Sequence, residues 1–195
     1  MRNVAINGLG RIGRLVLRHY SENPPENIRL TAANSSTSIE DLAYLIKYDS
    51  VHGKAPFPVS YGSDYLTLES RRLDIVNSRD PALIPWKEHD IDIVLECTGV
   101  FKKRVDVARH LQAGASKVII SAPAAESDAT FVIGCKREDL RSQKAPHCLK
   151  CVVHDQQHCS RRQSAQRCFR RYRVPDDDNG PCLYVEPGPR RQIGK

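Results

Sequence analysis

Three glycines near the start of the chain, Gly8, Gly10 and Gly13, are spaced as G-x-G-x-x-G. A short apolar run at 3–7 precedes them, and apolar residues at helical spacing follow at 14–20. This context favours a strand, a tight turn and a helix whose free N–H groups face a phosphate. Gly8 allows the turn, Gly10 lets a pyrophosphate approach the backbone, and Gly13 permits close helix–strand packing. We therefore expect a dinucleotide-binding fold, with a glycine-rich turn that binds no ligand as the alternative.

Strand and helix patterns alternate over about the first 143 residues. Strands are expected at 28–33, 91–96, 117–121 and 130–134, helices at 39–47 and 105–113, and a short antiparallel excursion within 57–76. Ser38 is expected to cap the helix that begins after it, because a serine side chain can accept from a free helical N–H. The alternation predicts an α/β fold, a Rossmann-type doubly wound sheet that is mainly parallel and covered on both faces.

The end of the second predicted strand departs from the usual dinucleotide pattern. An acidic residue normally stands there to bind the ribose hydroxyls, but the chain reads Asn34-Ser35-Ser36. Ser35 can still hydrogen-bond a ribose hydroxyl, more weakly than a carboxylate, and it would not repel a 2′-phosphate. These residues leave the preference between NAD and NADP open, and a simple polar turn is the alternative reading.

The positive charge of the chain is concentrated in its last quarter. Residues 1–143 carry 19 Lys and Arg against 18 Asp and Glu, whereas 144–195 carry 11 against 5. Five of the seven cysteines lie in 144–195, and its few large apolar residues show no helical or strand periodicity. We expect a dinucleotide-binding domain over 1–143 and a basic, disordered tail over 144–195, which has too little apolar surface to offset its chain entropy.

Composition also bears on where the protein works. No apolar run is long enough to span a bilayer. The first residues lack the apolar stretch and cleavage site of a secretory signal. We therefore expect a cytoplasmic protein with no membrane partner, whose cysteines are reduced thiols.

Several longer motifs occur in a fixed order: VAINGLGRIGR, KYDSVHG, SRDP with a nearby PW, ECTGVF and KVIISAPA. Together they resemble the first half of phosphorylating glyceraldehyde-3-phosphate dehydrogenase, over about 1–141, and the related erythrose-4-phosphate dehydrogenase is the near alternative. The resemblance implies an oxidoreductase of glycolysis that uses NAD. It also implies a homotetrameric family, most of whose interface lies in the half that has no counterpart here.

The same resemblance implies a cofactor site built from the glycine loop and the ends of several strands. Its residues are Gly8, Gly10, Arg11, Ile12, Gly13, Asn34, Ser35, Arg79, Thr98, Gly99 and Ser121. Arg11 and Ile12 would meet the pyrophosphate, Arg79 would lie beside the adenine, and Ser121 would approach the nicotinamide. Ser35 stands where most relatives carry an aspartate, so NADP is possible beside NAD. Asn34 would lie near the adenosine, and Thr98 with Gly99 would line the cleft.

The catalytic motifs of that family are absent from the chain. Its nucleophilic cysteine lies in a motif like SNASCTTN and its histidine base in one like TTVHAYT, a pairing typical of activated thiolates. Synonymous codons for 149–156, read one base later, spell SNASCTTN, and those for 176–187 with the next glycine codon spell MMTTVHAYTSNQ. We therefore interpret 144–195 as an out-of-frame segment. We expect no catalytic residues, no dehydrogenase activity and weak dinucleotide binding.

A different reading of 144–195 is a metal-binding tail. Cys148, Cys151, His154, His158 and Cys159 offer thiolates and imidazoles of the kind that bind zinc, and the basic charge could contact nucleic acid. The spacing is not that of a standard finger, and no amphipathic helix carries it. We therefore expect neither a metal site nor a nucleic-acid partner. A non-catalytic dinucleotide-binding module is a third reading.

Overall fold

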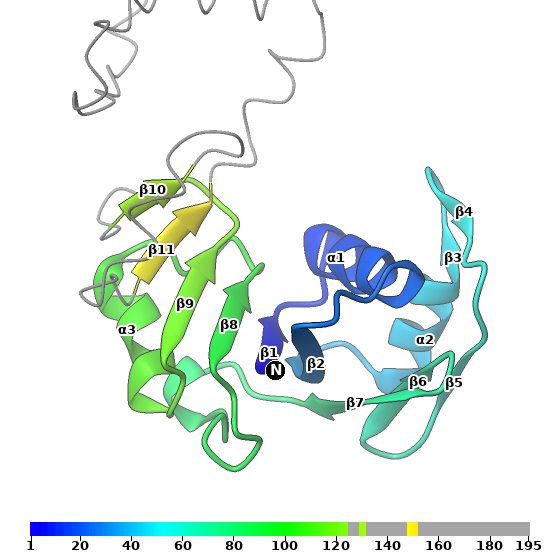
Figure 1. The fold of residues 1–195 in the computed structure, drawn as a ribbon, viewed down its shortest axis with the longest axis horizontal. Helices are drawn as coiled ribbons and strands as arrows, with labels where there is room; N and C mark the ends of the chain where they lie inside the picture. The colour runs from blue at the N-terminus through cyan, green and yellow to red at the C-terminus, as the bar shows by residue number, and fades with distance from the viewer. Residues whose placement is uncertain (125–128, 132–147, 152–195) are drawn as a thin grey trace, which may run out of the picture. The chain divides into compact units, whose positions relative to one another are not determined.

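A main sheet organises the part of the chain that the computed structural model describes, which is 1–124, 129–131 and 148–151. These residues lie in the unit Met1–His154, and only the backbone is described for the last two ranges. Figure 1 shows the elements, which in chain order are β1 (Arg2–Asn7), α1 (Arg11–Glu22), β2 (Ile28–Asn34), α2 (Ile39–Lys47), β3 (Tyr48–Asp49), β4 (Gly53–Lys54), β5 (Val59–Tyr61), β6 (Tyr65–Leu68), β7 (Arg71–Val76), the 3-10 helix η1 (Pro81–Leu83), β8 (Ile93–Glu96), α3 (Arg104–Gln112), β9 (Lys117–Ile120), β10 (Ala129–Phe131) and β11 (Cys148–Cys151).

The main sheet has nine strands within the described residues, in the order β10-β11-β9-β8-β1-β2-β7-β6-β5. Neighbouring strands are parallel from β10 through β7, whereas β6 and β5 pair in antiparallel fashion. The parallel neighbours β1 and β2 are connected through α1, and β8 and β9 through α3, as parallel pairing requires. The predicted Rossmann-type, mainly parallel α/β sheet is confirmed, and the predicted antiparallel excursion is the edge formed by β5, β6 and β7.

The strand order reverses beside β1. Val4 of β1 pairs with Leu30 of β2 on one edge and with Ile93 of β8 on the other. The chain therefore leaves β1 toward one side of the sheet and later returns on the opposite side. In open α/β sheets this reversal opens a crevice beyond the carboxyl ends of the strands, which is where ligands bind.

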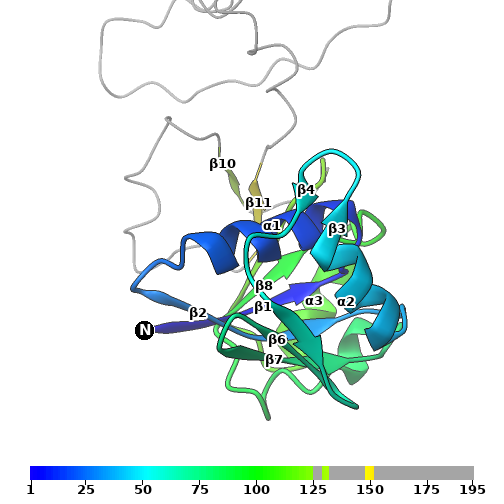
Figure 2. The same cartoon turned by 90° about the vertical axis from the view of Figure 1, so that its right-hand side faces the viewer.

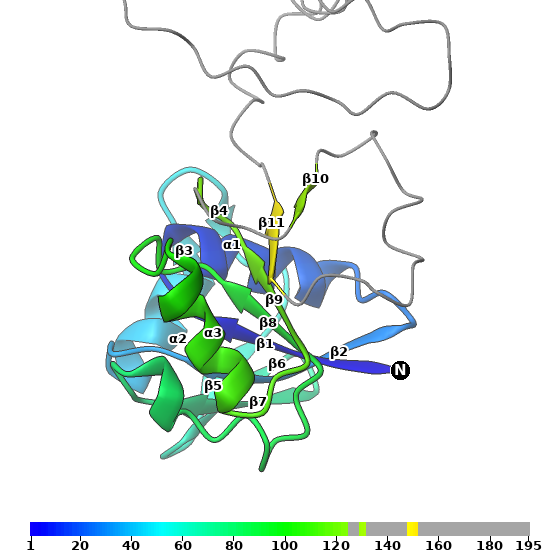
Figure 3. The same ribbon diagram turned by 90° about the vertical axis from the view of Figure 1, so that its left-hand side faces the viewer.

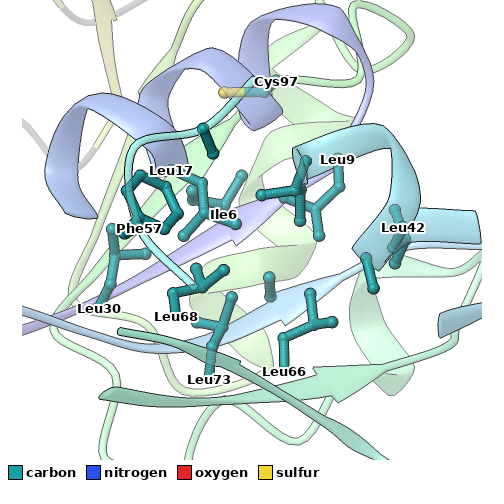
Figure 4. Packing of buried hydrophobic residues seen from close by; sticks show 14 residues of the cluster. Ile6, Leu9, Leu17, Leu30, Leu42, Phe57, Leu66, Leu68, Leu73 and Cys97 are labelled. Carbon is teal, nitrogen blue, oxygen red and sulfur yellow. The ribbon is translucent and has the colours of Figure 1, made fainter. Parts of the chain in front are cut away.

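Adjacent residues of β1 face opposite sides of the sheet and enter separate cores. Ile6 packs in a cluster with Leu17 of α1 and Leu42 of α2, which Figure 4 shows from close by. Ala5 packs in a second cluster with Val107 of α3. Helices α1 and α2 therefore cover one face and α3 the other (Figure 2, Figure 3). Each fully buried Leu or Ile contributes about 2 kcal/mol of hydrophobic stabilisation, and the two cores together support the crevice.

The start of α2 confirms the cap predicted from the sequence. The Ser38 side chain accepts a hydrogen bond from the Asp41 backbone N–H at 3.2 Å. Glu40 and Asp41 stand in the first turn and Lys47 in the last, so the charges complement the helix dipole. The bounds of α2 match the prediction for the same reason: every signal that defines them is local.

The helices of this fold are short. The longest in the described part of the chain, α1, has 12 residues. Within the described ranges, no helix combines the length and apolarity needed to cross a bilayer.

Two features of the structure differ from the sequence prediction. β3 and β4 form a short antiparallel hairpin in a segment for which no strand is predicted. β11 lies between β9 and β10, although 148–151 falls in the segment expected to be disordered. Backbone pairing with an open strand edge requires no apolar periodicity, so the sequence carries no signal for it. The boundary at 143 stays a prediction, and 132–134 and 152–195 lie outside the described residues.

Candidate functional site

A pocket of about 480 Å³ opens at the carboxyl ends of β1, β2 and β8, at the point where the strand order reverses. Its walls are the glycine loop after β1, the Ser-rich loop after β2, the segment 78–81 after β7, and the loop after β8. Among the lining residues in the described part of the chain, none is acidic and two are arginines, Arg14 and Arg79. The pocket therefore suits an anionic ligand.

The three glycines have distinct steric roles in this loop. Gly8 has a φ of +94°, and a Cβ there would lie 2.9 Å from the Thr98 backbone nitrogen. A Cβ on Gly13 would lie 2.1 Å from the Gly8 carbonyl oxygen, so no side chain can be accommodated. A Cβ on Gly10 would meet nothing within 4 Å, and this residue lines the open pocket. The turn predicted at Gly8 and the close packing predicted at Gly13 are confirmed, and the space at Gly10 fits a phosphate cradle.

Arg14 is a pocket residue that the sequence analysis missed. Its guanidinium donates to the Leu9 carbonyl oxygen at 3.1 Å, while its Nε is buried without a protein acceptor. A buried unsatisfied donor costs about 1–3 kcal/mol, and the first turn of a helix disfavours a cation. An anion at the start of α1 resolves both costs, so the residues present fit a bound pyrophosphate. A cation so close to a helix start, directly after G-x-G-x-x-G, is the signal that could have identified it.

At the β2 side of the pocket, hydrogen bonds of the Asn34 side chain connect the end of β2 to the end of β1 and to the segment after β7. Its Nδ2 donates to Asn7 Oδ1 at 2.7 Å and to the Ser78 carbonyl at 2.8 Å, and its Oδ1 accepts from Ser78 N at 2.9 Å. Asn34 lines the pocket, but its amide is engaged within the protein. Ser35 is buried beside it, and its hydroxyl oxygen accepts from Thr37 N at 3.2 Å. Asn34 and Ser35 are both polar and uncharged.

At the β8 side, Glu96 is fully buried below the pocket. Its Oε1 accepts from the Thr98 backbone N–H at 2.9 Å and from the Thr98 hydroxyl, and its Oε2 accepts from Asn7 Nδ2 and contacts His110 Nε2 at 3.1 Å. The Trp86 indole N–H points to His110 Nδ1 at 2.9 Å. An indole only donates, so His110 Nδ1 carries the lone pair and its Nε2–H donates to Glu96.

Cys97, which lines the same side of the pocket, is a poor nucleophile. Burial raises the pKa of the Cys97 thiol to about 11. The charge of Glu96 raises this pKa further, whereas a hydrogen bond with Ser121 lowers it. The reactive form of cysteine is the thiolate. At neutral pH Cys97 is therefore an unreactive thiol that forms part of the pocket wall.

The predicted site residues divide into two groups. Those that line the pocket are Gly8, Gly10, Asn34, Ser35, Arg79 and Thr98. Arg11 and Ile12 are exposed in the first turn of α1, and Gly13 lies behind the loop. Gly99 follows Thr98 with a φ of +71°, and Ser121 reaches the site through Cys97.

In the described ranges, no three His, Cys, Asp or Glu side chains are grouped to hold a metal ion. The side chains of the zinc ligands that the sequence offers lie outside the described part, namely those of Cys148, Cys151, His154, His158 and Cys159.

The glycine loop, the pocket at the strand reversal and the unsatisfied Arg14 define a dinucleotide-binding domain of Rossmann type. Residues 2–104 match the family described as glyceraldehyde 3-phosphate dehydrogenase, NAD binding domain. The chain belongs to this family, and its cofactor is NAD.

Curated relatives agree with this assignment. The chain is 44% identical over 154 residues to glyceraldehyde-3-phosphate dehydrogenase of Thermotoga maritima, covering 78% of this chain and 46% of the relative. It is 46% identical over 146 residues to that of Geobacillus stearothermophilus, covering 75% and 43%. It is 42% identical over 142 residues to the chloroplastic enzyme A of Chlamydomonas reinhardtii, covering 72% and 38%. The chain thus spans less than half the length of these relatives, and the resemblance read from its motifs is confirmed.

Proposed function

We propose that the chain is the dinucleotide-binding part of a glyceraldehyde-3-phosphate dehydrogenase-like oxidoreductase, and that in its present form it binds NAD without oxidising an aldehyde. The observation that carries the proposal is the cradle at the start of α1, where Gly10 leaves open space and Arg14 has a buried donor without an acceptor. The lineage activity that follows from the family is oxidation of an aldehyde sugar phosphate with inorganic phosphate. Glyceraldehyde 3-phosphate is the substrate favoured over erythrose 4-phosphate.

Each part of the pocket suits one part of the dinucleotide. The N–H groups of Arg11 and Ile12, the open face of Gly10 and the Arg14 guanidinium would bind the pyrophosphate. The loop after β2 and Arg79 would bind the adenosine. Bound NAD supplies the hydride acceptor, and the protein residues orient it and exclude water. Because no acidic residue lines the β2 side in the described part, NADP is accepted beside NAD.

The proposal of inactivity follows from the residues that the chemistry needs. A phosphorylating aldehyde dehydrogenase of this family needs a cysteine thiolate and a histidine base. In the described part, Cys97 is held as a thiol, and both nitrogens of His110 are engaged with Trp86 and Glu96. The sequence of 144–195 has neither catalytic motif, in keeping with an out-of-frame segment. Phosphate-dependent reduction of NAD by the purified chain, above a heat-denatured control, would refute this part.

Calorimetric titration of the whole chain with NAD tests the binding proposal. We expect saturable binding by the wild type, weakened about tenfold in Arg14→Met, because a charged hydrogen bond to phosphate is worth about 1.5 kcal/mol. Gly10→Val should leave the fold intact, since its side chain meets open space, and should abolish binding. Arg29→Met, an exposed arginine at the opposite end of β2, is the control and should bind as the wild type. A wild type that does not bind NAD contradicts the proposal.

The state of the gene and of the assembly needs separate measurements. Sequencing genomic DNA across the codons for 141–151 tests the proposed frame change. A single-base difference there would restore the reading frame that encodes the catalytic motifs of the family. Light scattering of this chain, whose monomer mass is 21.9 kDa, measures its assembly directly. Cytoplasmic location and the lack of a nucleic-acid partner stay predictions.

A further inference from the structure

The buried carboxylate of Glu96 lies under one particular half of the pocket. In Rossmann domains the pyrophosphate binds at the start of the first helix and the adenine ribose at the end of the second strand. This orientation leaves the β8 side, lined by Cys97, Thr98 and Phe101, for the nicotinamide. Glu96 is the last residue of β8, and its carboxylate accepts a hydrogen bond from the Thr98 backbone N–H.

The donors that surround Glu96 satisfy a carboxylate but bring no positive charge. The Asn7 amide and the Thr98 backbone N–H are neutral donors, and so is His110, whose Nδ1 accepts from Trp86. The Thr98 hydroxyl donates to Glu96 Oε1, and its oxygen accepts from the Val100 N–H at 3.1 Å. All four contacts donate, which is the pattern of a carboxylate anion rather than of a carboxylic acid.

No Lys or Arg of the described residues pairs with this charge. Among the described side chains, only His110 lies within ion-pairing distance of the Glu96 carboxylate, and it is the neutral tautomer. The arginines of the pocket are Arg14, on the pyrophosphate side, and Arg79, on the β2 side. The effect of the charge reaches the pocket wall, since it contributes to the raised pKa of the neighbouring Cys97 thiol. A charge in a poorly solvated site acts over several ångströms with little screening.

We propose that Glu96 determines the redox preference of the site, because its buried negative charge favours oxidised NAD, which has a cationic nicotinamide ring, over reduced NADH, which has a neutral ring. The two forms carry the same phosphates and adenosine, so Arg14, Arg79 and the loop after β2 act equally on both. The inference rests on the proposed dinucleotide function and deepens it. It requires no bond to be made or broken.

Calorimetric titration of the whole chain with NAD and, separately, with NADH tests the inference. The wild type should bind NAD more tightly than NADH, and Glu96→Gln should lower that preference about fivefold, as expected for the loss of one charge at such range. Glu96→Asp, which keeps the charge, should retain most of it. Glu88→Gln removes an exposed carboxylate and should leave the preference unchanged. Trp86, the single tryptophan, donates into the same network, so its emission shows whether each variant keeps the fold.

The outcomes distinguish a failure of the proposed dinucleotide function from a failure of the role proposed for Glu96. If the wild type binds neither form, the proposed dinucleotide function fails and the inference fails with it. If the wild type binds both, equal affinities or a preference for NADH overturn the inference alone, even where Glu96→Gln fails to fold. A folded Glu96→Gln with an unchanged preference overturns it as well. A preference that falls in Glu96→Gln and persists in Glu96→Asp supports it.

Discussion

The two sides of the pocket are held in place by side chains of different charge. The β2 side is held by a neutral amide, Asn34, which connects Asn7 to Ser78. The β8 side is held by a buried anion, Glu96, which connects Asn7 to Thr98. The usual pattern places the acidic residue at the β2 side, in contact with the ribose. Here the acid lies at the other side and out of contact range, so it can act on the ligand only through its field.

The largest effect should come from removing the histidine on the charged side. His110→Leu leaves the Trp86 N–H without an acceptor and takes one donor from the Glu96 carboxylate, all in a fully buried site. We expect the free energy of unfolding to fall by about 3 kcal/mol. Urea denaturation followed by Trp86 emission measures it. His19→Leu, at an exposed position, is the matched control. Equal losses in the two variants would show that the network adds no stability.

The next effect concerns the reactivity of the thiol on the charged side. Because the pKa of Cys97 is raised from 9.0 to about 11, its alkylation at pH 7 should be about a hundredfold slower than that of an ordinary thiol. The rate should rise tenfold per pH unit up to about pH 10, as the thiolate fraction grows. Mass spectrometry of the Cys97 peptide after timed iodoacetamide treatment measures it. A plateau at pH 9 would contradict the raised pKa.

Ser121 provides a check on the same measurement. Its hydrogen bond lowers the pKa of Cys97, so Ser121→Ala should raise that pKa further and slow the alkylation. A faster reaction in Ser121→Ala would show that access, rather than thiolate fraction, limits the rate.

On the β2 side, Asn34→Ala should lower the free energy of unfolding by about 2 kcal/mol, since it removes three hydrogen bonds. Asn7 Oδ1 and the backbone N–H and carbonyl of Ser78 lose the partner that Asn34 provides. It should weaken NAD and NADH binding by equal factors, because this side does not distinguish the ring charge. Denaturation and titration together measure both effects. Asn77→Ala, at an exposed neighbouring position, should change neither. Unequal losses of affinity for NAD and NADH would show that the β2 side also responds to the charge of the nicotinamide ring.

The smallest effect should follow from adding an acid to the β2 side. Ser35→Asp restores the usual carboxylate, and it should lower the affinity for NADP relative to NAD about tenfold through repulsion of the 2′-phosphate. Competitive titration of the two dinucleotides gives the ratio. Ser60→Asp, exposed on β5, should leave the ratio unchanged. Loss of NAD binding equal to the loss of NADP binding would mean that the new carboxylate disturbs the loop instead.

The features predicted from the sequence are those fixed by neighbours along the chain. The steric limit at Gly13 comes from the Gly8 carbonyl of the same motif, and Ser38 caps α2 within its own first turn. The network at the β8 side could not be predicted in this way. Trp86 and His110 come from separate segments, and His110 contacts both Trp86 and Glu96 only after α3 packs on the sheet. The sequence predicts a strand that ends at Glu96, but neither the burial of its carboxylate nor its partners.

The hydrogen bonds around Asn7 also affect how the protein ages chemically. Asn7 is followed by Gly8, the pairing in which a backbone nitrogen most readily attacks the preceding amide and converts asparagine to aspartate. Here the Gly8 N–H donates to the Asn34 carbonyl at 2.9 Å, and the Asn7 side chain is buried between Asn34 and Glu96. The folded chain therefore protects the Asn7 side-chain amide from deamidation. In the unfolded chain the reaction would proceed, and the product would place a second carboxylate beside Glu96 and oppose refolding.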